Sequence, residues 1–421
     1  MRGRVGRGES TAALVLAGLA LAAVGAACDL VAPAPVRAQN PFALVNIGTN
    51  VRSTDARMEG RGGWGLAEQD TLNPAFKNPA SLAELNAVTI LLSGYAESND
   101  SKAAEAERRT RRTFTPNARA AIPLLGGRLV FSTGFQARRA TQYTTVNRYS
   151  TLLEGQLVPY DREFVRQGTQ FDIPLILSWR PWSQMGLAAG LNLVRGNTRE
   201  VLNDFFIFDA DSNGVTDFLV PSHIQEDEYH GTSSTLALQW QPHARLRLGA
   251  ILTPAHGVDV KRTIQIENVA HKAESSFHLD WPYAWAAGAD YRMAERWRCG
   301  ADYEFSAFSQ FRGREDWQRD MVDEWRLSFG VERLRGTARR SPWGNLPLRL
   351  GASLHRWAYR VGDADIRELR IAVGTGFPFR GNAGSLDIAL SHGWIGKLDE
   401  NGLQDRVWRL SVSVTGMEKW W

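Results

Sequence analysis

Long apolar runs and cysteines are scarce in this chain. After residue 38 there is no run of about 18 apolar residues, which excludes a membrane-spanning helix. Of the two cysteines, only Cys299 follows residue 38, so the mature chain has no internal disulfide and no cysteine-based metal site.

Recognisable catalytic motifs are missing as well. The sequence contains no His-Glu-x-x-His, no Gly-x-Ser-x-Gly and no phosphate-binding loop ending in Gly-Lys-Ser/Thr. His355 and His392 stand alone, and a lone histidine is more often structural than catalytic. We therefore expect a protein that is not an enzyme.

The N-terminus carries half of the net charge. Three arginines within the first seven residues precede an apolar run over 11–26, and a small-residue site ends at Ala38. This layout predicts a secretory signal peptide over 1–38, although Cys28 leaves a lipid anchor as an alternative. Cleavage removes four basic and two acidic residues and lowers the net charge from +4 to +2, which gives no reason to expect a nucleic-acid partner.

Glycine and tryptophan, in contrast, are abundant, with 39 and 15 residues. From about residue 85 onward the sequence alternates with period two, and the clearest case is the end of the chain. Trp408, Leu410 and Val412 fall on one face there, whereas the other face carries Arg409 and Ser411. A lipid-facing belt with tryptophan near the strand ends and a lumen of small polar residues produce this pattern.

The alternation predicts a transmembrane antiparallel β-barrel of about 14 strands, because strands that cross a bilayer must close into a barrel. Short turns separate some strands, whereas 97–110, 140–164, 199–225, 268–278 and 310–321 are predicted as long outer loops. The run 244–267 is interpreted as one kinked strand, with two strands broken near Pro254 as the alternative. The predicted strands are 85–96, 111–122, 127–139, 165–181, 184–198, 226–242, 244–267, 279–293, 296–309, 322–335, 345–360, 364–379, 382–397 and 404–416.

Residues 39–84 lack the alternating pattern of a strand. They contain a glycine-rich stretch over 60–65, and Asn78-Pro79-Ala80 stands just before the first strand. With the kinked run over 248–254 and Trp281-Pro282-Tyr283, these features resemble the FadL-type family of outer-membrane transporters. That resemblance implies a 14-stranded barrel over 85–421, a plug over 39–84 in its lumen, and a ligand path that leaves sideways through the wall.

Two further groups of residues are candidate sites. Asp209, Asp211, Asn213 and Asp217 have the spacing of a calcium loop, but Val220 stands where the final glutamate belongs, so a polar turn is the alternative. Arg326, Arg349 and Arg370 are expected on lumen-facing positions. They either pair with lumen carboxylates such as Glu332, Asp302 or Asp387, or form a clamp for an acidic lipid.

Together these features predict passive uptake of long-chain fatty acids or other hydrophobic compounds across the outer membrane of a diderm bacterium. The expected partners are outer-membrane lipid, a hydrophobic ligand and, during biogenesis, the barrel-assembly machinery. No cofactor is expected beyond the possible calcium ion. A scaffold barrel serving protein secretion and a polar-solute porin are the alternatives.

Overall fold

A computed structural model describes residues 47–52, 55–68, 76–103, 107–153, 156–208, 217–219, 222–266, 272–336, 345–361, 363–379, 381 and 383–418. Strands occupy fourteen wall positions in this part of the chain. Among the described residues, no helix is long and apolar enough to cross a membrane. In chain order the wall strands are β2 (Val88–Ala103), β3 (Glu107–Leu124), β4 (Leu129–Leu153), β5 (Gln156–Trp182), β6 (Met185–Phe208), β8 (Ser222–His243), β9 (Leu246–Thr253) with β10 (His256–Ile266), β11 (Lys272–Trp281) with β12 (Ala284–Ala294), β13 (Trp297–Ser306), β14 (Glu324–Arg333), β15 (Leu348–Val361), β16 (Ala364–Pro378), β17 (Gly384–Ile395) and β18 (Leu403–Glu418).

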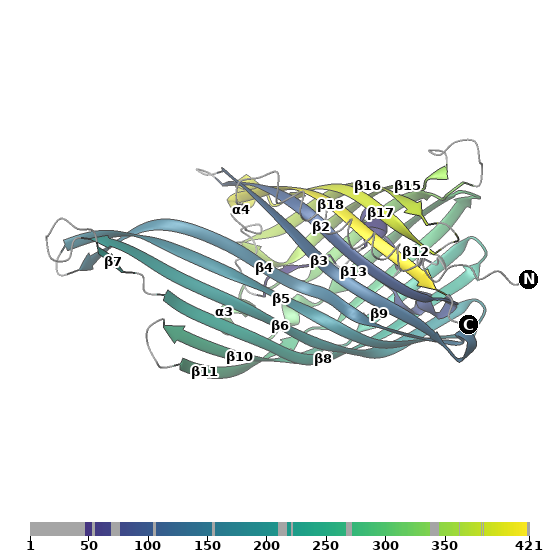
Figure 1. Ribbon diagram of the computed structural model, residues 1–421, viewed down its shortest axis with the longest axis horizontal. Coiled ribbons are helices and arrows are strands. Elements are labelled where there is room, and N and C mark those ends of the chain that lie inside the picture. Colours follow the sequence, from purple (N-terminus) through teal and green to yellow (C-terminus); the bar gives the residue numbers. More distant parts are fainter. Residues whose placement is uncertain are drawn as a thin grey trace, which may run out of the picture.

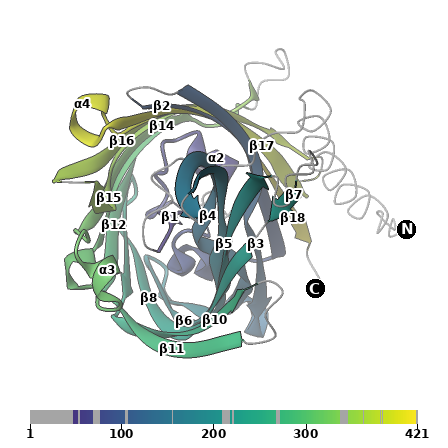
Figure 2. The same ribbon diagram turned by 90° about the vertical axis from the view of Figure 1, so that its left-hand side faces the viewer.

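The sheet closes on itself, as Figure 2 shows from one end. The last strand, β18, pairs antiparallel with the first wall strand, β2, from Leu403↔Ala103 to Glu418↔Val88. Closure supplies hydrogen-bond partners to strand edges that a bilayer would leave unsatisfied. The predicted fold, a closed antiparallel barrel of 14 strands, is therefore confirmed.

The two faces of each strand follow the predicted alternation. On β16, Leu369 and Ile371 point outward and are 47% and 49% exposed, whereas Arg370 between them is 2% exposed. Tryptophans 179, 182, 240, 285, 297 and 408 are also exposed on the outer face. Three other tryptophans, Trp64, Trp281 and Trp357, are instead buried inside the molecule.

The predicted long outer loops are mostly wrong. β4 and β5 remain paired through the segment 140–164 until Leu153↔Gln156, and β6 and β8 remain paired until Asn203↔Ser222. These hairpins project far beyond the rest of the barrel (Figure 1). The cause is that strands outside the bilayer need no apolar face, so the loss of alternation marked the edge of the membrane rather than the end of the strand. Of the predicted loops, 310–321 does lie largely outside strands.

The run 244–267 holds one wall position and breaks at 254–255 into β9 and β10. β8 pairs with both pieces, through Leu236↔Leu252 and Gly231↔Val258. The neighbouring strand breaks at the same level, between β11 and β12. Pro254 and Pro282 lie at these breaks and have no backbone N–H to donate to a ladder, which explains why both strands kink together.

Short elements complete the molecule. A described N-terminal segment, which includes β1, α2 and η2, lies within the ring of strands (Figure 2). We call residues 47–52, 55–68 and 76–87 the lumen segment. The short elements are β1 (Thr49–Asn50), α2 (Ala56–Glu59), η2 (Pro79–Glu84), η3 (Leu125–Gly127), β7 (Asp217–Leu219), η4 (Phe308–Gln310), α3 (Glu315–Gln318) and α4 (Leu398–Asn401).

Candidate functional site

The lumen segment is compact because its own side chains cap its turns. Asp55 caps α2 by accepting a hydrogen bond from the backbone N–H of Met58 at 2.7 Å. The chain then reverses at Gly62 and Gly63, whose φ angles of 73° and 98° favour glycine. The glycine-rich stretch seen in the sequence thus forms the tight turn that presents Arg61 and Trp64 to the wall.

Glycines on the inner wall let this turn approach closely. A Cβ atom on Gly351 would lie 2.0 Å from the carbonyl carbon of Arg61, and one on Gly300 would lie 2.0 Å from the Trp64 indole nitrogen. That nitrogen donates to the backbone oxygen of Ala289 at 3.1 Å. The small lumen face therefore makes room for the segment inside the barrel.

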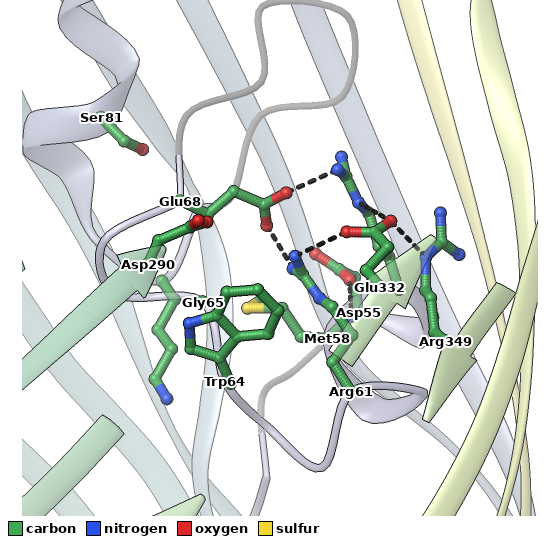
Figure 3. A network of polar contacts seen from close by, with 12 residues as sticks. Asp55, Met58, Arg61, Trp64, Gly65, Glu68, Ser81, Asp290, Glu332 and Arg349 are labelled. Carbon is green, nitrogen blue, oxygen red and sulfur yellow. Dashed lines mark hydrogen bonds and ion pairs between the residues drawn. The ribbon is translucent and has the colours of Figure 1, made fainter. Parts of the chain in front are cut away.

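Charged groups connect the segment to the wall (Figure 3). Glu68 forms ion pairs with Arg57 and Arg61 of the segment and with Arg298 of β13. Glu332 of β14 lies 3.2 Å from Arg61 and also pairs with Arg298. All five residues are at most 6% exposed, so each charge depends on its partners for compensation.

The pKa values of two acids in the segment diverge. Burial would raise the pKa of Glu68, but Arg57, Arg61 and Arg298 outweigh it and lower that pKa to about 2. Burial raises the pKa of Asp55 to about 6, because the Met58 N–H and a more distant Arg61 compensate only partly. Glu68 is thus held ionised, whereas Asp55 titrates close to neutral pH.

The Asn78-Pro79-Ala80 motif attaches the segment at a second place. The Asn78 amide nitrogen donates to Leu66 O at 2.8 Å and to Leu238 O of β8 at 3.0 Å, while its oxygen caps η2 by accepting from Ala80 N. Ser178 of β5 donates to the Pro79 carbonyl oxygen at 2.7 Å. The motif thus joins two parts of the segment to two wall strands, but its role in a plug stays a prediction.

Beside this motif lies a cavity of about 300 Å³ between the segment and the wall. Phe76 and Lys77 border it on the segment side, and Lys77 Nζ pairs with Asp302 at 3.0 Å and Glu304 at 2.8 Å. The wall supplies apolar groups as well, including Ile176 and Ile251. The lumen therefore contains free space with both polar and apolar walls.

A cluster of buried apolar side chains fills another part of the lumen. Trp281 of β11 packs edge-on against Phe308 and Phe311, with ring centroids 5.6 and 6.0 Å apart. These phenylalanines belong to the non-strand segment 307–323, and Ile47 of the lumen segment joins the same cluster. An apolar ligand moving along the barrel axis would meet this cluster as well as the charged network.

The wall has a gap between β3 and β4. Their pairing runs from Leu124↔Leu129 only to Asn117↔Gln136, although both strands continue and pair with their other neighbours. Strand β1 of the lumen segment pairs with the freed edge of β4, through Thr49↔Ala140. Figure 1 shows β3 diverging from β4 in the projecting half of the barrel.

An irregularity in β4 accompanies this gap. The register of β4 against β5 shifts at Arg138, so this residue is an extra one in the strand. Its guanidinium donates to His256 Nε2 at 3.0 Å and lies 4.7 Å from the Trp281 ring centroid. The bulge therefore connects the edge of the gap with the kink between β9 and β10.

The three predicted ligand-binding arginines do not form one clamp. Arg349 donates to Glu332 at 2.8 Å and to Asp387 at 2.6 Å. Arg370 donates to Glu368 at 2.8 Å and to Ser391 at 3.1 Å. Arg326 differs, because it lines a cavity and its Nε has no hydrogen-bond partner in the described part of the chain.

The predicted calcium residues Asp209, Asp211 and Asn213 lie outside the described residues, and Asp217 is described only as the first residue of β7. In the part of the chain that the structure describes, no group of three potential ligands is placed to hold a metal ion. Calcium binding by this loop stays a prediction.

Glu68 and Arg138 are the site residues that the sequence did not single out. Nothing in the local pattern marks Glu68, because its wall partner Arg298 lies far away in the chain. The only local signal near Arg138 is the blurred alternation at Thr133 and Gly134.

Comparisons with known proteins agree with this geometry. The family model BamG matches residues 230–421, and no curated protein matches the chain. A FadL homologue of Pseudomonas aeruginosa has a TM-score of 0.57 at 12% identity, and the match covers 88% of this chain and 99% of that one. The toluene transporters TodX of Pseudomonas putida and TbuX of Ralstonia pickettii have TM-scores of 0.53 and 0.52, at 14% and 13% identity, with the same coverage.

These likenesses show the class of the fold, a closed antiparallel β-barrel. More particularly, the chain has the fold of the FadL homologue and the toluene transporters, as the resemblance in the sequence predicted.

Proposed function

We propose that this protein sits in the outer membrane and allows hydrophobic compounds, long-chain fatty acids among them, to enter passively. The observation that carries the proposal is the gap between β3 and β4 beside a lumen occupied by its own chain. Apolar molecules gain about 0.8 kcal/mol for each CH₂ that leaves water, so a sideways route into lipid favours them over a watery pore. The solved structures with this fold include proteins described as toluene transporters.

In this proposal the ligand enters from the projecting end, passes the apolar cluster around Trp281, and leaves through the gap between β3 and β4. The lumen segment acts as the plug, because its charged network and its Asn78 contacts hold it against the wall. Strand β1 lies at the gap itself and belongs to the same segment. Movement of the plug would therefore act directly on the exit.

Uptake into vesicles tests this function. Purified protein in liposomes should speed the entry of oleate or toluene, followed with a fluorescent reporter enclosed in the vesicle. Liposomes that carry heat-denatured protein are the matched control. The proposal would be wrong if oleate and toluene each entered liposomes with native protein no faster than liposomes with heat-denatured protein.

A second candidate is a scaffold barrel that serves the assembly of other outer-membrane proteins. The match of the BamG model to residues 230–421 favours it, since that name points to the barrel-assembly machinery. Co-purification of a stoichiometric partner complex from native membranes, together with inert behaviour in the liposome assay, would support this candidate. A polar-solute porin is a third possibility that planar-bilayer conductance tests, because a filled lumen should conduct few ions.

A further inference from the structure

One long edge of β4 lies outside the bilayer beside no other strand. β4 pairs with β5 on one side as far as Leu153, and this hairpin projects beyond the end of β3 (Figure 1). On the other side, the pairing with β3 ends at Gln136, and β1 covers only residues 139–140. In the described part of the chain, no strand therefore pairs with β4 over 145–153, which we call the β4 edge. At 3.3 Å per residue, this edge is ~30 Å long.

Backbone groups of alternate β4 residues point to the side of this edge. The carbonyl oxygen of Ala140 accepts from the Thr49 hydroxyl of β1 at 3.1 Å, and that of Thr144 accepts from the Arg108 guanidinium of β3 at 2.6 Å. The N–H and C=O groups of one strand residue point the same way, and the direction alternates along the strand. The N–H and C=O groups of Val146 and of every second residue after it therefore face the β4 edge.

The β4 edge lacks the residues that usually prevent the addition of another strand. It contains no proline, glycine or lysine, and its only charged residue is Arg148. It also carries residues that favour strands, such as Val146 and Tyr149. An exposed edge of this composition is a template for pairing with another chain. The pairing of β1 with residues 139–140 shows that β4 accepts a strand on this side.

Apolar side chains are exposed on the same hairpin, although it lies outside the bilayer. Val146, Leu152 and Leu157 share its outer face and are 58%, 70% and 69% exposed. Leu152 lies directly opposite Leu157 in the β4–β5 ladder. Exposed apolar groups that gather in this way mark contacts with other molecules. A strand added beside β4 would cover part of this surface.

The strand on the other side of the gap is basic. β3 contains four arginines and one glutamate over 107–112. Asp100 and Glu97 of β2 compensate two of the arginines, whereas Arg108 reaches β4 and Arg111 is exposed. A segment that lies between β3 and β4 would therefore meet a net positive charge, which favours acidic side chains.

We propose that the β4 edge binds an extended, acidic segment of a partner polypeptide outside the membrane, which adds to the sheet as an antiparallel strand. Backbone hydrogen bonds to the edge would provide the affinity, and the arginines of β3 would select the charge. The added strand begins beyond Thr144, because Arg108 already occupies that carbonyl group. This inference goes beyond the proposed transport, since it requires neither the lumen nor a transported ligand.

A second copy of this chain fits the β4 edge less well than another polypeptide does. Two barrels in one membrane have the same orientation, so their β4 strands run outward in the same direction. The same edge on both copies then cannot form an antiparallel ladder. An extended segment of another protein has no such restriction.

Peptide binding to the full chain in lipid nanodiscs tests the proposal. The probe is a fluorescent peptide of about 12 residues that alternates valine and glutamate, and the matched control peptide alternates valine and lysine. Fluorescence anisotropy should show that wild type binds the acidic peptide at least tenfold more tightly than the basic one. Arg111→Gln should reduce that preference several-fold, because it removes an exposed positive charge beside the gap.

A proline on the β4 edge tests whether the peptide adds as a strand. Val146→Pro removes an N–H that faces the edge and leaves the ladder with β5 in place, so it should weaken binding of the acidic peptide at least tenfold. Val146→Thr is the matched control, because it keeps the N–H and should bind like wild type. Circular dichroism should show the same strand content in both variants.

Three results would overturn the proposal. Equal binding of the acidic peptide by Val146→Pro and wild type would show that the peptide does not pair with the β4 edge. Equal affinity of wild type for the acidic and the basic peptide would show that β3 selects no charge. A dimer in analytical ultracentrifugation that Val146→Pro dissociates would assign the edge to a second copy of this chain.

Discussion

One carboxylate, Glu68, compensates three arginines in the lumen, and its loss should release the segment. Glu68→Gln leaves Arg57, Arg61 and Arg298 with less negative charge in a buried place, which should cost about 3 to 5 kcal/mol. Because the segment is held less firmly, the backbone amides of residues 55–68 should exchange their hydrogens faster in lipid nanodiscs. The control is Glu107→Gln, which removes an exposed ion pair with Lys102 and should leave the exchange of residues 55–68 unchanged, because solvent screens exposed charges. Unchanged protection in Glu68→Gln would show that the network does not hold the segment.

Asn78 has two roles that can be tested separately, since it caps η2 and also joins the lumen segment to the wall. Asn78→Ala should weaken attachment of the segment by about 1 to 3 kcal/mol, because it removes the bonds to Leu66 and Leu238 and the cap of η2. Asn78→Asp keeps the capping oxygen but replaces the donor with an oxygen that faces the carbonyl oxygens of Leu66 and Leu238. If the donor joins segment and wall, exchange of η2 and of residues near Leu66 should rise in both variants. A wild-type pattern in Asn78→Asp would assign the motif to capping alone.

Single residues were only partly predictable from the sequence. Asn78 stood out because asparagine before proline marks a specific turn, and that chemistry is local. Arg326, Arg349 and Arg370 were placed on the lumen side because strand alternation fixes the facing of a side chain. Glu332 and Asp387, which Arg349 contacts, were among the lumen carboxylates expected from the sequence. The contact between Glu59 and Ser391 was not foreseeable, because it spans most of the chain. Pairing in a closed barrel depends on which strands lie opposite one another, and a single sequence does not contain that information.

Elements were predicted well where the bilayer imposes a pattern. Alternation located all fourteen wall positions and the kink near Pro254, because lipid on one face and a lumen on the other demand it. It failed over 140–164 and 199–225, where both faces meet water and the strands nevertheless continue. The pairing of β1 with β4 was also missed, since two residues carry no periodicity.

The bulge in β4 leads to a prediction about the gap. Deleting Arg138 should make Ala137 and Arg139 consecutive opposite Phe171 and Gln170, which straightens the strand. Arg138→Ala keeps the extra residue and removes only the side chain that reaches His256. If the bulge holds the gap open, the deletion should slow liposome uptake of oleate at least tenfold, and the substitution should slow it much less. Equal rates in the two variants would place the exit elsewhere.

At the scale of the whole molecule, fold and lumen depend on one another. The inner wall is rich in glycine because a folded segment lies against it, as at Gly351 beside Arg61. The sequence indicated the small residues but not what fills the space, because an empty lumen and a filled one produce similar alternation. The buried charges on the wall and on the segment explain why the lumen is filled. They are stable only while wall and segment remain together, so the occupied lumen is a property of the complete barrel.

That dependence makes the lumen sensitive to acid. The folded pKa values of Glu59 and Glu68 are both lowered to about 2, since arginines outweigh the effect of burial. An acid whose folded pKa is lowered stabilises the fold above its ordinary pKa of 4.5, and that contribution is lost as the pH falls from 4.5 towards 2. Asp55 acts in the opposite direction. Its pKa of about 6 lies above the ordinary 3.8, so it stabilises most below 3.8 and loses that effect as the pH rises through 6.

The two glutamates belong to networks with several arginines, so their loss should dominate below pH 4. Ion conductance of single barrels in a planar bilayer of zwitterionic lipid should therefore be low at pH 7 and rise several-fold between pH 4 and pH 2.5. It should fall again when the pH is restored, because the backbone pairing of β18 with β2 closes the wall without these carboxylates. Glu68→Gln should shift the rise to higher pH, since part of the network is already neutral. A conductance that stays low down to pH 2.5 in both proteins would mean that packing, and not charge, keeps the segment inside the barrel.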